Sequence, residues 1–232
     1  MTLWAVVPVK PLRRGKSRLA SVLSEEERTT LNRKLLAHTI ETLVKIPELE
    51  QVLVISRDPE ALALARYRGA RTVLEDGAPH LNVALTRATV VAATYAARGI
   101  LILPADLPQI SEDDIRTMIQ EGEEPPVVVI APDHRKEGTN AMLINPAGLI
   151  KYVFGPNSYE RHVALAEAKG AKVKILELPS LAHDVDLPED LAFLDGQLQY
   201  WTETEQEEDG REEYKGYYGE LAAQDGDKEM KG

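Results

Sequence analysis

The chain has 232 residues, of which 38 are acidic and 27 are basic, and it contains no cysteine. The missing cysteines exclude a disulfide framework, a thiol nucleophile and thiolate metal sites. A formal net charge of −11 argues against a surface that binds nucleic acid, and the apolar runs are too short to cross a membrane. The first residues lack the order of a signal peptide, so we expect a cytoplasmic protein.

Apolar runs of strand length alternate with helical patterns along residues 1–200. The first run, LWAVVPV, is apolar throughout, as in a strand that is buried on both faces. Ser24 followed by Glu27 forms a capping-box pattern, which predicts the start of a helix. We predict strands at 3–9, 52–56, 72–74, 100–103, 127–131, 141–144 and 172–178. We predict helices at 25–46, 59–67, 81–97, 112–120 and 158–169, and a last helix that begins near residue 188.

This alternation predicts an α/β fold, a three-layer Rossmann-like sandwich with a mostly parallel central sheet. Residues 127–144 leave too little chain between two strands for a crossover helix, which predicts a small antiparallel excursion. We expect one domain at residues 1–200. Residues 201–232 hold eleven acidic and four basic side chains and few aliphatic ones, so we expect an acidic, disordered tail there.

A basic loop follows the first predicted strand. It contains Lys10, Arg13, Arg14, Lys16 and Arg18. Such a loop suits a triphosphate, because lysine and arginine side chains bind phosphate oxygens. The sequence Gly-Lys-Ser at 15–17 is similar to the end of a P-loop, but Lys10 stands where that motif requires glycine, so we reject a P-loop. A solvated basic loop without a ligand is the alternative.

Three aspartates are candidate metal ligands. Asp106 follows the apolar strand at 100–103, and ligands bind beyond the carboxyl ends of parallel strands. Asp184 and Asp186 form a second acidic pair just before the last predicted helix. Mg²⁺ prefers one or two carboxylates together with substrate phosphates and water. The alternative is structural: Asp106 would cap a turn, and Asp186 would cap the helix near residue 188.

Two further polar stretches are candidate binding segments. Residues 133–140 form a basic turn that enters a strand. Residues 154–162 form a loop that runs into a helix, whose first N–H groups could hold an anion. We expect Ser158 to be the N-cap of that helix. The five histidines show no metal-ligand spacing, and we assign none of them a catalytic role.

Six motifs occur together and in order in this chain. They are PVKPLRRGKSRL at 8–19, LNVAL at 81–85, LPADLPQI at 103–110, GTNAM at 138–142, FGPNSYERH at 154–162 and DVDLPEDL at 184–191. With this set the chain resembles, over about residues 3–198, the CofC/FbiD guanylyltransferases of coenzyme F-420 biosynthesis. The resemblance implies the nucleotide-diphospho-sugar-transferase fold of the wider nucleotidyltransferases.

The resemblance also implies a reaction and a set of site residues. A phosphorylated three-carbon acid, phosphoenolpyruvate or 2-phospho-L-lactate, would attack the α-phosphate of GTP, and pyrophosphate would leave. The expected catalytic residues are Lys16, Arg18 and Asp106, with Mg²⁺ held by Asp106 and Asp186 and with Asp184 as a second candidate ligand. The expected nucleotide-binding residues are Pro8, Val9, Lys10, Lys16, Arg18 and Asn82. The expected acid-binding residues are Thr139, Gly155 and Ser158.

Two positions depart from the family pattern. His80 stands where relatives often have glycine, which makes the expected base contact beside it less secure, and Leu187 stands where they usually have threonine. The residues leave open which acid is used, because both compounds present the same phosphate and carboxylate. They also leave open a nucleotidyltransferase for molybdopterin or a sugar phosphate, a non-catalytic nucleotide-binding module, a homo-oligomer, and contact with the next enzyme of the pathway.

Overall fold

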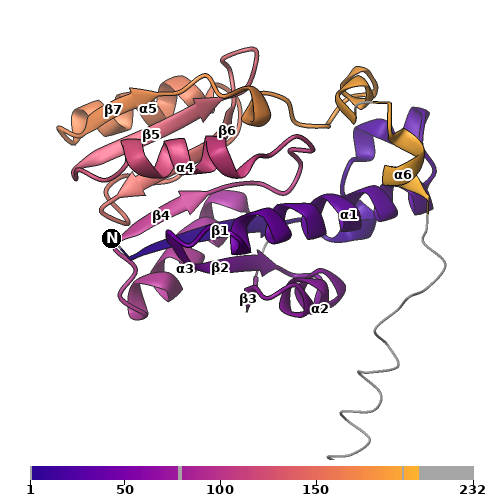
Figure 1. Cartoon of the computed structure of the whole chain (residues 1–232), viewed down its shortest axis with the longest axis horizontal. Coiled ribbons are helices and arrows are strands. Elements are labelled where there is room, and N and C mark those ends of the chain that lie inside the picture. Colours follow the sequence, from indigo (N-terminus) through magenta and orange to yellow (C-terminus); the bar gives the residue numbers. More distant parts are fainter. Residues whose placement is uncertain (1, 78–79, 195, 204–232) are drawn as a thin grey trace, which may run out of the picture. The chain divides into compact units, whose positions relative to one another are not determined.

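The computed structural model describes residues 2–77, 80–194 and 196–203 of the chain (Figure 1). The described residues up to Thr202 belong to one compact unit, which ends at that residue. Trp201 and Thr202, which the sequence analysis placed in the tail, are buried in this unit. The rest of the predicted acidic tail lies outside the described residues.

A single mixed sheet organises the described part of the chain. Its strands follow the order β3-β2-β1-β4-β6-β5-β7. They are β1 Leu3–Val9, β2 Leu49–Ser56, β3 Arg71–Leu74, β4 Gly99–Ile102, β5 Val127–Pro132, β6 Thr139–Asn145 and β7 Lys172–Ile175. Only β6 runs against its neighbours β4 and β5, while the other pairs among the described strands are parallel. The predicted α/β fold and its antiparallel excursion are thus confirmed.

The order of the strands reverses direction beside β1. The chain runs from β1 outward to β2 and β3, and then returns to the other side of β1 as β4. Open parallel sheets bind ligands at such a switch point, beyond the carboxyl ends of the strands. The segments that follow β1 and β4 therefore lie where this architecture places a ligand.

Helices cover both faces of the sheet. They are α1 Glu25–Val44, α2 Pro59–Tyr67, α3 Leu81–Thr94, α4 Glu112–Glu121 and α5 Ser158–Ala168, and a short helix, α6 Leu198–Thr202, packs against α1 in a separate apolar cluster. One apolar cluster joins α1, α2 and α4 to one face, and a second joins α3 and α5 to the other. Successive residues of β1 alternate between the two clusters, since side chains of a strand point to opposite faces. This explains why the first strand is apolar at every position.

The predicted helices differ from the structure in several details. The last predicted helix is a 3₁₀ helix, Pro188–Leu194. The N-cap of α5 is Asn157, which has a left-handed backbone conformation, and Ser158 is the first helical residue. The helix α3 ends at Thr94, before Ala96 takes a positive φ of 63° that a helix cannot continue through.

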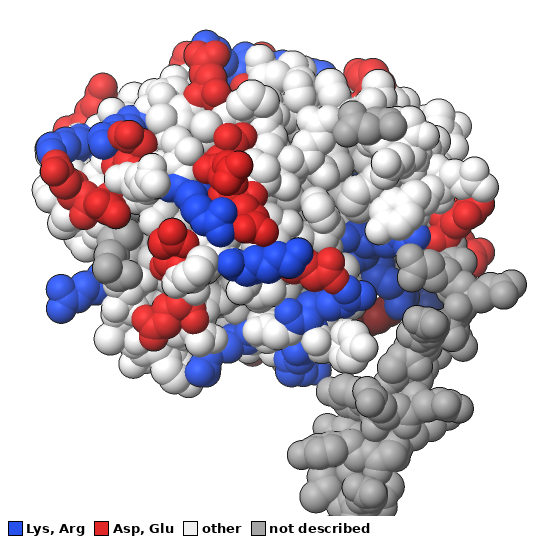
Figure 2. All heavy atoms as spheres, viewed as in Figure 1, with Lys and Arg blue, Asp and Glu red and all other residues white. Residues whose placement is uncertain are grey.

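Charges of both signs lie interspersed on the face of the molecule shown in Figure 2. Ion pairs join neighbouring elements of the molecule, such as Arg33 of α1 with Glu60 of α2. No helix among the described residues is long and apolar enough to span a bilayer.

Candidate active site at the strand ends

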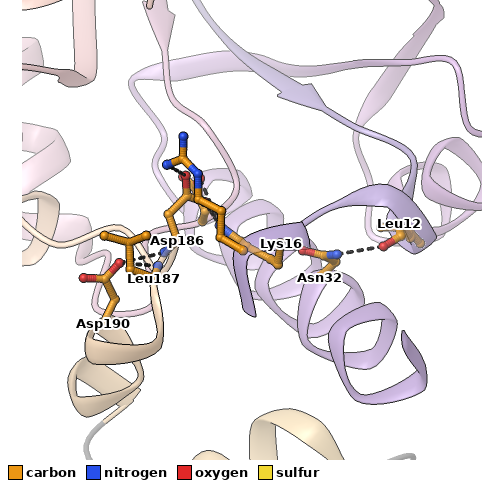
Figure 3. Close-up of polar contacts among 8 residues, drawn as sticks. Leu12, Lys16, Asn32, Asp186, Leu187 and Asp190 are labelled. Atoms are coloured by element: carbon orange, nitrogen blue, oxygen red, sulfur yellow. Dashed lines mark hydrogen bonds and ion pairs between the residues drawn. The ribbon is translucent and has the colours of Figure 1, made fainter. Parts of the chain in front are cut away.

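Lys16 is the centre of a cluster of charged side chains at the carboxyl ends of β1 and β4 (Figure 3). Its Nζ atom donates to Asp106 Oδ2 and to Asp186 Oδ1, each at 3.1 Å. Its side chain is only 6% exposed. Arg18 reaches Asp186 from the solvent side, with 3.7 Å between Nη1 and Oδ2. The structure therefore brings together residues from three of the six motifs.

Three carboxylates of this cluster are arranged as metal ligands would be. Asp106, Asp184 and Asp186 each offer an oxygen atom, and these atoms lie within 4.8 Å of one another. Asp106 Oδ1 is buried and has no hydrogen-bond partner among the described residues. A buried carboxylate oxygen without a partner is costly, and a bound cation would satisfy it. The donor set is oxygen only, which suits Mg²⁺.

The close charges shift the pKa values of these groups. Burial would lower the pKa of Lys16, but Asp106 and Asp186 together raise it above its ordinary value. Burial would raise the pKa of Asp186, but Lys16 and two further cations of the basic loop hold it below its ordinary value. Burial, and then the charges of Asp106 and Asp186, raises the pKa of Asp184 to about 6. The cluster thus has a surplus of negative charge that a divalent cation would offset.

Asp184→Asn is expected to stabilise the metal-free protein above the raised pKa. Because the folded chain binds a proton at Asp184 more tightly than the unfolded chain, ionisation of Asp184 costs stability as pH rises from 3.8 to about 6. At neutral pH the melting temperature should rise by about 3 °C, the shift that about 1 kcal/mol produces in a domain of this size. Thermal unfolding in a chelator at a series of pH values measures this. A difference that stays constant as pH falls would contradict the assignment.

Backbone contacts hold the two acidic segments in place. The Val185 N–H donates to the Asp106 carbonyl at 3.1 Å, which ties the segment of Asp184 and Asp186 to the turn after β4. The buried Asp190 carboxylate accepts the N–H groups of Asp186 and Leu187, at 2.9 and 2.6 Å. The Asp186 carboxylate itself contacts Lys16 and Arg18, and a role for it as the cap of the last helix stays a prediction. Asp190 orders the turn, which leaves the Asp186 carboxylate to Lys16.

Two polar side chains that the sequence analysis did not single out fix the basic loop. Asn32 of α1 donates from Nδ2 to the Leu12 carbonyl at 2.7 Å (Figure 3). Asp58, the N-cap of α2, accepts the Leu12 N–H at 2.7 Å. Asp58 before a proline is a typical cap signature and could have been found, whereas Asn32 lies inside a helix and gives no such signal. Both contacts hold the loop that carries Lys16.

Gly15→Ala is expected to weaken this anchorage. A Cβ atom at Gly15 would lie 2.5 Å from Asn32 Nδ2, so Asn32 would have to give up its bond to Leu12. Losing that bond should cost about 1 kcal/mol and lower the melting temperature by about 3 °C. Thermal unfolding measured on the two single variants and the double variant gives the interaction free energy between positions 15 and 32. The double variant should be no less stable than Asn32→Ala, and additive losses would rule the contact out as the cause.

The candidate acid-binding residues form a second group at the same edge of the sheet. Because β6 is reversed, its first residue, Thr139, lies at the edge where β1 and β4 end. The Ser158 hydroxyl donates to Thr139 Oγ1 at 3.3 Å, and both residues are buried. Gly155 has a φ of 129°, a backbone conformation that residues with a side chain rarely adopt. A backbone hydrogen bond joins the turn before Thr139 to the segment before Asp184, since the His134 N–H donates to the Ala182 carbonyl.

The remaining candidate residues lie around these two groups. Pro8 and Val9 are half-buried at the end of β1, and Lys10 is exposed beyond them. Asn82, in the first turn of α3, donates from Nδ2 to the Phe154 carbonyl and accepts the Phe154 N–H, at 3.1 and 2.8 Å. Its amide keeps one hydrogen and one lone pair for a ligand. The contact of Asn82 with the guanosine stays a prediction.

A model of a known protein family matches this chain. The family is described as "Guanylyl transferase CofC like", and it matches residues 3–203. The chain belongs to this family. The match confirms the resemblance that the six motifs indicate.

Named relatives of this CofC-like chain support the same family. The phosphoenolpyruvate guanylyltransferase of Rubrobacter xylanophilus is 41% identical over 202 residues, which cover 86% of this chain and 98% of that protein. The phosphoenolpyruvate guanylyltransferase of Sphaerobacter thermophilus is 39% identical over 196 residues, covering 84% and 94%. The CofC-like chain is therefore an enzyme, a nucleotidyltransferase.

Solved structures share the fold of the CofC-like chain. A candidate nucleotide-diphospho-sugar transferase of Desulfovibrio desulfuricans G20 superposes with a TM-score of 0.68, at 14% identity, over 91% of each chain. A CMP:2-keto-3-deoxy-manno-octonic acid synthetase in complex with CTP superposes with a TM-score of 0.59, at 13% identity, over 86% of this chain and 99% of that one. These likenesses confirm the predicted nucleotide-diphospho-sugar-transferase fold.

Proposed function

We propose that this chain transfers the guanylyl group of GTP to phosphoenolpyruvate and releases pyrophosphate, as a step in coenzyme F-420 biosynthesis. The observation that supports this most is the juxtaposition of Lys16 with three aspartates at the switch point of a CofC-like chain. The named relatives support phosphoenolpyruvate over 2-phospho-L-lactate as the acid.

The proposed chemistry requires two polyanions to meet. A phosphate oxygen of the acid forms a bond to the α-phosphorus of GTP, and the bond from that phosphorus to the bridging oxygen of the β-phosphate breaks. The electron pair leaves with pyrophosphate. Two unit charges about 4 Å apart repel by about 4 kcal/mol at an effective dielectric constant of 20, so the site must supply positive charge. The attacking oxygen is already anionic, and no general base is needed.

The residues of the charged cluster fit these demands. Asp106 and Asp186, with Asp184 as a second candidate, would hold Mg²⁺, which when bound would neutralise negative charge on the triphosphate and on the leaving pyrophosphate. Lys16 and Arg18 would bind phosphate oxygens, since both cations face the same edge of the sheet. The hydroxyl pair of Thr139 and Ser158 would bind the acid.

One assay tests the proposal. The purified protein is given GTP and Mg²⁺ with phosphoenolpyruvate, with 2-phospho-L-lactate or with a sugar phosphate, and pyrophosphate release is followed. We expect release with phosphoenolpyruvate and a large loss of activity when ATP, CTP or UTP replaces GTP. Pyrophosphate release with 2-phospho-L-lactate alone would show that this compound, and not phosphoenolpyruvate, is the acid substrate. Pyrophosphate release with the sugar phosphate alone would overturn the proposal. A chelator should abolish the activity, and excess Mg²⁺ should restore it.

A further inference from the structure

His162 contacts two parts of the candidate acid site through its two ring nitrogens. It lies on α5 and is fully buried. Its Nε2 atom accepts the Val153 N–H at 3.1 Å, and its Nδ1 atom lies 3.0 Å from Thr139 Oγ1. The ring of Phe154 packs against it edge to face, with the ring centroids 4.8 Å apart. One imidazole thus joins the start of β6 to the loop that contains Gly155.

The backbone contact fixes where the ring carries its proton. A backbone N–H can only donate, so Nε2 must be the nitrogen with the free lone pair. Burial, and then the charge of Arg161, lowers the pKa of His162 to about 4, so the ring is neutral near neutral pH. A neutral imidazole has one N–H, and it must be on Nδ1. Nδ1 therefore donates to Thr139.

The direction of that bond decides what the two hydroxyls can offer a ligand. Thr139 and Ser158 together carry two hydroxyl hydrogens, and one of them is used in the bond between the two side chains. Because His162 donates to Thr139, the second hydrogen is left over. In the opposite tautomer Thr139 would have to donate to His162, and only lone pairs would face a ligand. Lone pairs repel an anion, whereas an O–H group binds one.

We propose that His162 is a positioning residue that donates to Thr139 and so reserves a hydroxyl hydrogen for an anionic oxygen of the acid substrate. The identity of that substrate rests on the function proposed above. By accepting the Val153 N–H, the same ring also holds the loop with Gly155 against the hydroxyl pair.

A matched pair of variants tests this role. In His162→Asn the amide can place an N–H near the position of Nδ1, whereas His162→Leu has almost the same shape and no donor. For His162→Leu we expect the KM for phosphoenolpyruvate to rise about tenfold or more, as for a lost hydrogen bond to a charged group, and the KM for GTP to stay close to the wild-type value. His162→Asn should recover most of the loss. Equal values of the KM for the acid in the two variants would overturn the proposal.

A spectroscopic measurement on the wild-type protein is independent of the variants. Nitrogen-15 spectra of the histidine side chains near neutral pH should show His162 protonated at Nδ1 and unprotonated at Nε2. The opposite tautomer would overturn the proposal even if His162→Leu failed to fold. A wild-type protein that uses no phosphorylated acid would remove both this role and the proposed function. An active wild type with indistinguishable variants would remove the role of His162 alone.

Discussion

Asp106→Asn is expected to lower kcat by at least about 100-fold, the scale of losing a strong electrostatic contribution to transition-state stabilisation. The substitution keeps the shape of the side chain but removes its charge. One oxygen of Asp106 is bound to Lys16, and the other is buried without a partner among the described residues, so the amide would both weaken the ion pair and remove one of the proposed metal ligands. Initial rates of pyrophosphate release at saturating GTP and acid measure the effect.

The control for this variant is Asp113→Asn. Asp113 lies in the first turn of α4, and its side chain is 97% exposed. It should keep the wild-type kcat. Thermal unfolding of Asp106→Asn without metal should still show one cooperative transition, because Lys16 keeps its ion pair with Asp186 and the loss of kcat is then not a loss of the fold. Full activity of Asp106→Asn at saturating Mg²⁺ would show that this carboxylate does not bind the ion.

Lys16→Ala is expected to lower kcat/KM for GTP by about 100-fold, because it removes a buried cation from the site of two polyanions. It should also destabilise the metal-free protein by about 3 kcal/mol or more, since Asp106 and Asp186 would lose the charge that compensates them. Added Mg²⁺ should restore much of that stability. Steady-state kinetics with GTP varied, and thermal unfolding with and without Mg²⁺, measure the two effects.

Lys172→Ala is a suitable comparison for the lysine variant. Lys172, the first residue of β7, forms an exposed ion pair with Glu124. Such an exposed pair is expected to add little stability. It should change neither the kinetics with GTP nor the response of stability to Mg²⁺. If Lys16→Ala lost activity equally at limiting and saturating GTP, the role of Lys16 in binding the triphosphate would be contradicted.

The sequence predicted the sheet and its ligand-binding edge because these follow from local patterns. The apolar runs at β1 and β4 are buried on both faces, and charged residues follow each of them within four positions. Asp106 and Lys16 could therefore be placed at one edge without coordinates. The direct ion pair between Lys16 and Asp106 could not be predicted, because it depends on the conformations of two loops that are far apart in the chain.

Roles that depend on tertiary contacts are the ones that the sequence does not reveal. Asp190 lies just after the predicted start of the last helix, and its carboxylate binds the N–H groups of the two residues that precede Pro188. Ser158 looked like an N-cap, but its hydroxyl faces Thr139 on another element. The spacing of His162 along the chain indicates no role for it. In the structure both of its ring nitrogens contact other residues of the chain. Each of these roles depends on a tertiary contact and not on spacing along the chain.

The residues proposed to bind the two substrates come from different segments of the chain, on either side of the reversed strand β6 and within it. Side chains that would hold the donor nucleotide and its metal come from segments after β1, β4 and β7 and from the start of α3, whereas those that would hold the acceptor come from the beginning of β6, from the loop before α5 and from α5. Exchange of residues 139–162 should therefore redirect such an enzyme to a new acceptor when the exchanged segment keeps the backbone contacts of Phe154 with Asn82. This division offers a modular route by which one scaffold acquires many acceptors.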